Sequence, residues 1–408
     1  MPTTTRHRFR SELEAKHTQR LLTIGGAALL AFLAPLRVIV TVHALSPAEY
    51  GFLAIINTMT SFVPYLMTVG YSLQYQLMTV ERGPAALEVL SRQAVSNILR
   101  SAIPCGALTI LFVAPFASAQ KTLTIASLAV ITSACVAYMM LASQSLLGLG
   151  NRSSSALCLL VYNSLCSLLL LPLAALHLVS ILSIVLLWTL AAMLGALVSR
   201  RLLHRFQSLP QLSCLPLSLT QAGWALPVLL GPWTFLMLGR YFLGFSTSTA
   251  DVTQFSLAWT IVDLSYLVAV SGVTYLSTRL LRRDISASRV FGVSALGYTV
   301  ILCCVAVAAT IVIPRINHLY HINSILVVIL ALTGLARLAQ ATWAPLIVRN
   351  RAIHRLSLVY LCLAAVFVCA LATLPVTSLT LSFILTLALG VAALASASRT
   401  AMNRSDPQ

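Results

Sequence analysis

The residues of this sequence that could do chemistry are three arginines inside long apolar stretches. Arg37, Arg240 and Arg337 each interrupt a run of residues long enough to cross a bilayer. An arginine near the centre of a membrane helix costs roughly 2.5–3.5 kcal/mol, so three oppose insertion by roughly 8–10 kcal/mol. A chain tolerates such side chains when they face a polar, water-filled interior. The arginines therefore predict a cationic cavity in a membrane protein, and a cationic cavity suits an anionic cargo.

Polar residues follow one face of two stretches that are otherwise apolar. On the first stretch, Asn57, Ser61, Thr68, Tyr71 and Tyr75 recur at spacings that place them on one side of a helix. A second stretch has a similar face, formed by Ser256, Thr260, Asp263, Tyr266, Thr274 and Ser277. Serine and threonine also bond neighbouring membrane helices, which is the structural alternative for isolated hydroxyls. Two full-length faces in equivalent helices favour a water-filled, substrate-binding cavity instead.

Asp263 lies near the middle of its predicted span, at a depth that matches that of Arg337. We expect the two side chains to lie within about 4 Å, the range in which opposite charges interact strongly. One interpretation is a structural ion pair. The other is a proton-linked or substrate-linked switch, in which Asp263 is a possible coupling residue.

The composition is that of a polytopic membrane protein. Hydrophobic residues make up 59% of the chain and charged residues 9%, whereas a soluble domain carries about 25% charged residues. The net charge of +17 is better explained as a topology signal than as a nucleic-acid surface, because the basic residues fall in short loops. The nine cysteines show no metal-binding spacing, and no metal or other cofactor is expected.

Twelve membrane-spanning helices are expected. Apolar segments lie near 21–44, 52–78, 94–117, 122–149, 223–246, 252–278, 290–313 and 322–348. Two longer runs, 155–199 and 356–397, are each about twice a bilayer's length, so each is divided in two, at His177–Ser180 and at Leu374-Pro375. An amphipathic segment within 87–98 also predicts a short helix on the inner membrane surface, before the third span.

The distribution of basic residues fixes the expected orientation. With a cytoplasmic N-terminus, 21 of the 26 lysines and arginines lie in cytoplasmic segments and only Lys121 and Arg315 lie in outer loops. This bias predicts a multi-pass protein with both termini cytoplasmic.

The two halves of the chain resemble each other in phase. Arg37 and Arg240 are 203 residues apart, and an acidic residue, Glu49 or Asp251, follows each in a short outer loop. Six helices per half is an even number, so the halves enter the membrane in the same direction and should form two parallel lobes around a central cavity. The expected organisation is a basic tail (1–20), an N-lobe (21–199), a linker (200–222), a C-lobe (223–397) and a second tail (398–408).

Short motifs resemble those of polysaccharide flippases for O-antigen or exopolysaccharide, in the multidrug/oligosaccharidyl-lipid/polysaccharide exporter superfamily. The segment 45–51 (LSPAEYG) is similar to the turn that follows the first helix of these flippases. The segment 147–152 (LGLGNR) is similar to their turn between helices 4 and 5, and 239–244 (GRYFLG) is similar to the end of their seventh helix. Gly239 stands where that family has an acidic residue. The resemblance implies a V-shaped protein of the bacterial inner membrane that moves undecaprenyl-pyrophosphate-linked oligosaccharides from the inner to the outer leaflet by alternating access.

Two other functions stay open. One is an ion-coupled multidrug or small-molecule antiporter of the same superfamily, and the other is a membrane-embedded polysaccharide polymerase or ligase. Three intramembrane arginines against one aspartate favour a diphosphate over a cationic drug. The outer loops are short and no nucleotide-binding or nucleophile motif occurs in the sequence, so the chain is not expected to be an enzyme. The expected partners are the anionic lipid-linked oligosaccharide, membrane lipids and a proton or sodium ion, but no nucleic acid.

Overall fold

The computed structural model describes residues 33, 35–206, 218–281, 284–349 and 353–402, which form helices joined by short connections without any strand. The helices of the first half are Pro35–Ala44, α2 (Pro47–Met67), α3 (Ser72–Arg82), η1 (Gly83–Ala86), α4 (Leu87–Val113), η2 (Ala114–Phe116), α5 (Ala119–Gly148), α6 (Arg152–Leu168), α7 (Leu170–Ala175) and α8 (Ile181–Phe206). The helices of the second half are α9 (Leu219–Ser246), α10 (Thr249–Leu281), α11 (Ala287–Ile316), α12 (Ser324–Arg349), α13 (Ile353–Thr373) and α14 (Ser378–Met402).

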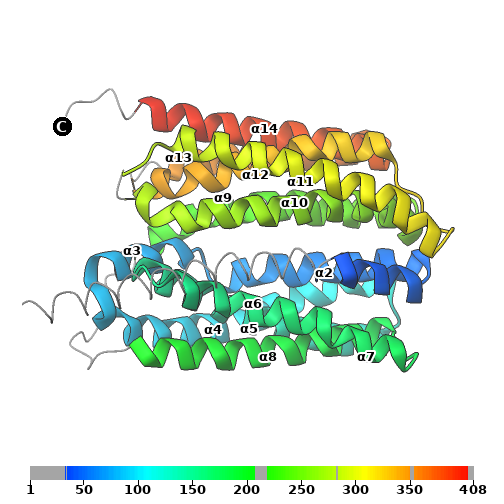
Figure 1. Cartoon of the computed structure of the whole chain (residues 1–408), viewed down its shortest axis with the longest axis horizontal. Coiled ribbons are helices and arrows are strands. Elements are labelled where there is room, and N and C mark those ends of the chain that lie inside the picture. Colours follow the sequence, from blue (N-terminus) through cyan, green and yellow to red (C-terminus); the bar gives the residue numbers. More distant parts are fainter. Residues whose placement is uncertain (1–32, 34, 207–217, 282–283, 350–352, 403–408) are drawn as a thin grey trace, which may run out of the picture.

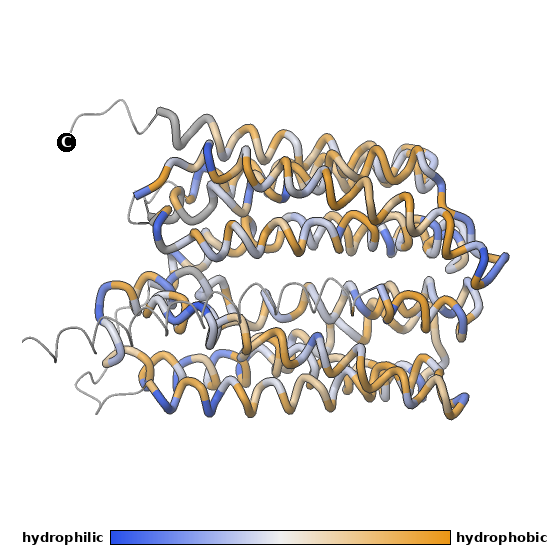
Figure 2. Tube along the Cα trace, in the orientation of Figure 1, coloured by the Kyte–Doolittle hydropathy of each residue, from blue (hydrophilic) through white to orange (hydrophobic). Residues whose placement is uncertain are grey.

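The helices have the length and composition of membrane spans. Eleven helical segments among the described residues are long and apolar enough to cross a bilayer, and Pro35–Ala44 is a shorter apolar helix in the place of the first predicted span. Figure 2 shows hydrophobic positions along the helices and hydrophilic positions gathered at the turns. The two predicted divisions of the long runs are both present, since α7 and α8 are separated at 176–180 and α13 and α14 at 374–377. The prediction of an all-helical protein with twelve spans is confirmed.

The helices gather into two bundles, with α2–α8 below and α9–α14 above in Figure 1. We call the described residues 35–206 the N-lobe and 218–402 the C-lobe. The same pattern of helix contacts occurs within each lobe. In the N-lobe α5 packs on α8, and α2 packs on α4 and α5. In the C-lobe α12 packs on α14, and α10 packs on α11 and α12. The repeated pattern agrees with two like-oriented lobes. The predicted boundaries at 199/200, 222/223 and 397/398 fall inside α8, α9 and α14, whereas the boundary at 20/21 lies outside the described residues. The division into tails, linker and lobes stays a prediction.

Local sequence explains how these helices begin and where one of them is interrupted. Ser46 and Glu49 form a capping box at the start of α2, in which the Ser46 amide donates to Glu49 Oε2 over 2.9 Å. The second span is interrupted at Val69 and Gly70, whose φ angles are +50° and +75°. Positive φ is strained for a β-branched residue such as valine. This break separates α2, which ends at Met67, from α3, which begins at Ser72.

The start of α4 differs from the prediction. The amphipathic segment 87–98 is not a separate surface helix, because α4 runs without interruption from Leu87 to Val113. Its apolar residues Leu87, Leu90 and Ala94 are buried against the bundle. The apolar face of this segment packs on protein, which the periodicity alone does not distinguish from packing on lipid.

The lobes meet at the predicted outer end through side chains of the C-lobe and the backbone of the N-lobe. Tyr320 Oη donates to the Leu45 carbonyl over 2.7 Å. Asn317 Nδ2 donates to the Val42 carbonyl over 3.1 Å. Thr253 Oγ1 donates to the Pro47 carbonyl. Tyr320 lies in a loop between spans, and burial raises the pKa of its phenol, so this hydroxyl stays a donor at physiological pH.

The lobes also meet at the predicted cytoplasmic end. Gln74 on α3 donates to the Ser218 carbonyl over 2.9 Å and accepts from the Ser218 amide over 3.2 Å. The guanidinium of Arg152 lies 4.4 Å above the ring of Tyr275. Contacts at both ends leave the middle of the interface as the place where a cavity can form.

Candidate functional site

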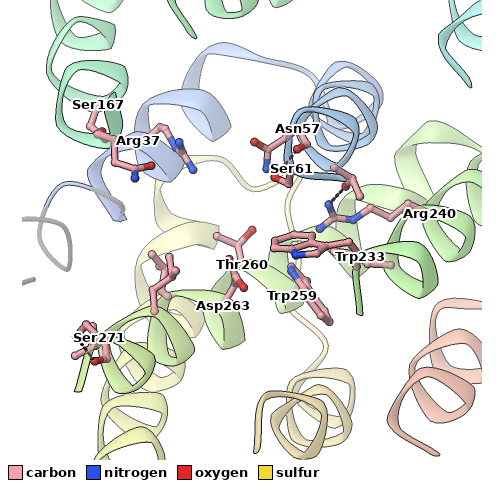
Figure 3. Close-up of a pocket in the computed structure, with 16 residues that line it drawn as sticks. Arg37, Asn57, Ser61, Ser167, Trp233, Arg240, Trp259, Thr260, Asp263 and Ser271 are labelled. Carbon is pink, nitrogen blue, oxygen red and sulfur yellow. Dashed lines mark hydrogen bonds between the residues drawn. The ribbon is translucent and has the colours of Figure 1, made fainter. Parts of the chain in front are cut away.

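A cavity of about 190 Å³ lies between the lobes at mid-depth of the helices. Side chains from both lobes line it, from Pro35–Ala44, α2 and α6 on one side and from α9 and α10 on the other. Its polar and aromatic lining residues are Arg37, Asn57, Thr58, Ser61, Asn163, Ser167, Trp233, Arg240, Trp259, Thr260, Asp263 and Ser271. Figure 3 shows Arg37 and Asn57 on opposite sides of the cavity, with Asp263 and the two tryptophans below them.

Arg240 extends from α9 across the interface to α2. Its side chain is buried, and Nη1 donates to the carbonyl of Ala54 over 3.2 Å and to Thr58 Oγ1. Arg240 Nε is buried without a hydrogen-bond partner. That nitrogen is enclosed by protein, so an anion in the cavity would meet the remaining N–H groups of the guanidinium, which lines the cavity.

Arg37 projects from the N-lobe and lines the main cavity together with a smaller one of about 60 Å³. The two cavities share four lining residues, Arg37, Asn57, Arg240 and Thr260. Within the described ranges, no acidic side chain lies within salt-bridge distance of Arg37 or Arg240. Two arginines without an acidic partner in those ranges, one from each lobe, thus line both cavities.

Asp263 and Arg337 form the predicted ion pair. Arg337 Nη1 lies 2.6 Å from Asp263 Oδ1, so the expected separation is confirmed. Arg337 departs from the prediction in one respect: its side chain is only 6% exposed and does not line the cavity, whereas Asp263 is 25% exposed and does. Asp263 on α10 lies between the cavity and Arg337, since Arg337 belongs to α12, which contributes no residue to the cavity lining.

Three aromatic rings complete the surroundings of Arg337. Its guanidinium carbon lies 4.1 Å from the ring centroid of Tyr266, 5.0 Å from that of Trp259 and 5.3 Å from that of Trp233. These distances are within the range of cation–π attraction. We call Asp263, Tyr266, Trp259 and Trp233 the Arg337 box.

The predicted polar face of the second span is divided by the break at Val69 and Gly70. Asn57 and Ser61, which precede the break, line the cavity. Thr68, Tyr71 and Tyr75 do not line it in this structure. Thr68 Oγ1 donates to the Tyr65 carbonyl over 2.8 Å, and the two tyrosines are buried against apolar residues. The regular spacing that linked the five residues assumed one unbroken helix.

The structure adds lining residues that the sequence analysis did not select. Asn163 and Ser167 lie one helical turn apart on α6, and Trp233 and Trp259 come from α9 and α10. The polar triplet Tyr162-Asn163-Ser164 inside the apolar run 155–199 is a signal that could have identified α6. The tryptophans had no such signal, because aromatic residues are common in membrane helices for packing alone.

Comparisons with known proteins identify the fold. No family model and no curated protein matches the sequence. The structure resembles an outward-facing multidrug resistance MATE family transporter of the MOP superfamily, with a TM-score of 0.62, 12% identity and coverage of 95% of this chain and 99% of that one. A MATE protein in the straight conformation gives a TM-score of 0.59 and 14% identity, with 94% of each chain covered.

A third similar structure is a MOP superfamily transporter from Pyrococcus furiosus. It gives a TM-score of 0.60 and 13% identity, and covers 94% of this chain and 97% of that one. That transporter is described as having a binding pocket of reverse polarity that suggests a different function. At these identities the likeness shows the fold, which is the twelve-helix fold of MATE transporters.

Proposed function

We propose that this chain is a membrane transporter that exports an anionic cargo by alternating access between its two lobes. The observation that carries the proposal is the sign of charge in the cavity between the lobes. Arg37 and Arg240 line it without an acidic partner among the described residues, and its one acidic lining residue, Asp263, is neutralised by Arg337. A cavity with excess positive charge attracts anions and repels cations.

The fold neighbours favour a small-molecule exporter. They include transporters described as multidrug resistance proteins, so an ion-coupled antiporter of small organic anions is the function we put first. The cavity volume of about 190 Å³ is below the roughly 300–1,000 Å³ of small-molecule pockets. It is further below the space that a lipid-linked oligosaccharide needs, which supports this order. Asp263, partly exposed to the cavity, is the proposed site of coupling to a proton or a sodium ion.

The transport of undecaprenyl-pyrophosphate-linked oligosaccharide is the second candidate. It is supported by the motifs at 45–51, 147–152 and 239–244, and by the two arginines, since guanidinium groups bind phosphate oxygens in a bidentate manner. In this case the cavity would hold the diphosphate while the lobes separate. The polymerase or ligase alternative gains no support from a transporter fold. The location in a bacterial inner membrane and the cytoplasmic termini stay predictions.

Binding of an anionic dye to the purified protein tests the shared chemistry. Arg240→Ala and Arg37→Ala should each weaken binding of a fluorescent aryl sulfonate at least tenfold, and Arg315→Ala is the matched control because Arg315 is an exposed arginine outside the cavity. Arg240→Lys should retain part of the affinity if positive charge suffices, and little if bidentate contact is required. Unchanged binding in the double alanine variant would contradict the proposal.

Transport assays then separate the two cargoes. An exporter of small organic anions should expel the dye from cells when the wild-type protein is expressed, and this activity should depend on Arg240. A glycan transporter should instead leave lipid-linked repeat units on the cytoplasmic leaflet when its gene is deleted. Observing neither effect would remove both cargo assignments.

A further inference from the structure

The surroundings of Arg337 contain more than an ion pair needs. A buried arginine is satisfied by a carboxylate with good hydrogen-bond geometry, and Asp263 provides it at 2.6 Å. Three aromatic rings with centroids 4.1–5.3 Å from the guanidinium carbon enclose the same group. A carboxylate combined with several aromatic faces is the arrangement that proteins use to bind organic cations.

The box is also part of the cavity wall. Trp233, Trp259 and Asp263 line the cavity, whereas Arg337 reaches the box from α12 behind them and does not line it. The side chain of Arg337 thus brings a cation from inside the protein to a site of which three members, Trp233, Trp259 and Asp263, line the cavity. A cation of the cargo and Arg337 would compete for the same carboxylate and the same rings.

We propose that the Arg337 box is a cation-binding site occupied by the chain's own arginine, and that Arg337 is thereby a residue that determines cargo specificity. By filling the box it excludes organic cations and leaves Arg37 and Arg240 to set the charge of the cavity. Without the arginine, the box accepts a small planar cation such as guanidinium, and the cavity gains affinity for cationic amphiphiles. The role of Arg337 in cargo specificity rests on the proposed function, whereas the occupancy of the box by Arg337 does not.

Chemical rescue tests the occupancy of the box. In detergent, guanidinium chloride at low millimolar concentration should raise the thermal unfolding midpoint of Arg337→Ala by several degrees and in a saturable manner. Urea has the same shape without the charge and should have no such effect, and sodium chloride controls for ionic strength. The wild-type protein and Arg337→Lys should not respond, because each already holds a cation in the box.

Two double variants assign the rescue to the box. Asp263→Asn and Trp259→Leu, each combined with Arg337→Ala, should remove the guanidinium response. If Arg337→Ala does not fold alone, folded protein should be recovered when guanidinium, but not urea, is present during extraction, and Arg337→Gln offers a nearly isosteric neutral variant for the same titration. An equal response to urea, no response in any folded variant, or a response that survives Asp263→Asn would overturn the proposal.

Binding of an aromatic cation tests the effect on specificity. Tetraphenylphosphonium should bind Arg337→Gln at least tenfold more tightly than the wild-type protein, and adding Asp263→Asn should abolish the gain. Equal binding by wild type and Arg337→Gln would refute the role in specificity. Neither experiment requires transport or anion binding, so a failure of the proposed function would be recognised separately, by the aryl sulfonate and its arginine variants.

Discussion

Removing Asp263 should destabilise the protein more than removing Arg337. The two side chains differ in exposure, with 6% for Arg337 and 25% for Asp263. Asp263→Ala leaves a cation enclosed in protein, and breaking a buried pair in this way costs about 3–5 kcal/mol. Arg337→Met leaves a carboxylate at the cavity wall, where water can hydrate it, so we expect about 1–3 kcal/mol.

The double variant completes the cycle. Asp263→Leu with Arg337→Met removes both charges and fills the space with apolar groups, which is often neutral or stabilising by about 1–4 kcal/mol. Unfolding in mixed detergent micelles, followed by tryptophan fluorescence, gives the three free energies. Arg315→Met is the control, because an exposed substitution should stay within about 0.5 kcal/mol of wild type.

Two results would refute this reasoning. An Arg337→Met variant as unstable as Asp263→Ala would mean that exposure to the cavity does not hydrate the carboxylate. A double variant as unstable as Asp263→Ala would mean that the aromatic rings, rather than the charges, hold these helices together. A double variant that folds but does not export would support the coupling role of Asp263, whereas normal export would leave a structural pair.

Further predictions concern the predicted outer end of the interface. Gly51→Val should push the lobes apart there, because a Cβ at this position would overlap the carbonyl oxygen of Thr249. Gly223→Val is the control, since there is open space around Gly223. The measurement is faster labelling, by an impermeant maleimide, of a cysteine introduced in place of the cavity-lining Ser61. Equal labelling rates would contradict it. Tyr320→Phe should cost about 1–3 kcal/mol of stability, because the buried carbonyl of Leu45 loses its donor; an unchanged unfolding free energy would show that water replaces the hydroxyl.

The sequence predicted the helices well because membrane spans follow simple rules. Apolar length located the spans, and the weak breaks at 177–180 and 374–375 divided the two long runs correctly. The pairing of Asp263 with Arg337 was also predictable, since the depth of a residue along a membrane helix follows from its distance to the helix ends. The length of an apolar run and the depth of a residue along its helix can both be counted directly from the sequence.

The direction of side chains was less predictable. A single break at Val69 and Gly70 separated Tyr71 and Tyr75 from the cavity, and helical periodicity does not reveal such a break. Arg337 was expected to line the cavity, but which face of α12 points inward depends on the packing of three helices. The aromatic rings of the Arg337 box left no pattern in the sequence, because cation–π contacts join residues from different helices without any fixed spacing.

The hydrogen bonds at the predicted outer end have a consequence for how the two halves can diverge. Tyr320, Asn317 and Thr253 all donate from C-lobe side chains to N-lobe main-chain carbonyls. A mutation in the N-lobe cannot delete a carbonyl, so these three bonds place no demand on the side chains at 42, 45 and 47, although Val42 and Leu45 are also core residues. These bonds therefore depend on side-chain identity in the C-lobe alone: substitutions of Tyr320, Asn317 or Thr253 can remove a donor, whereas substitutions in the N-lobe leave the three acceptors in place.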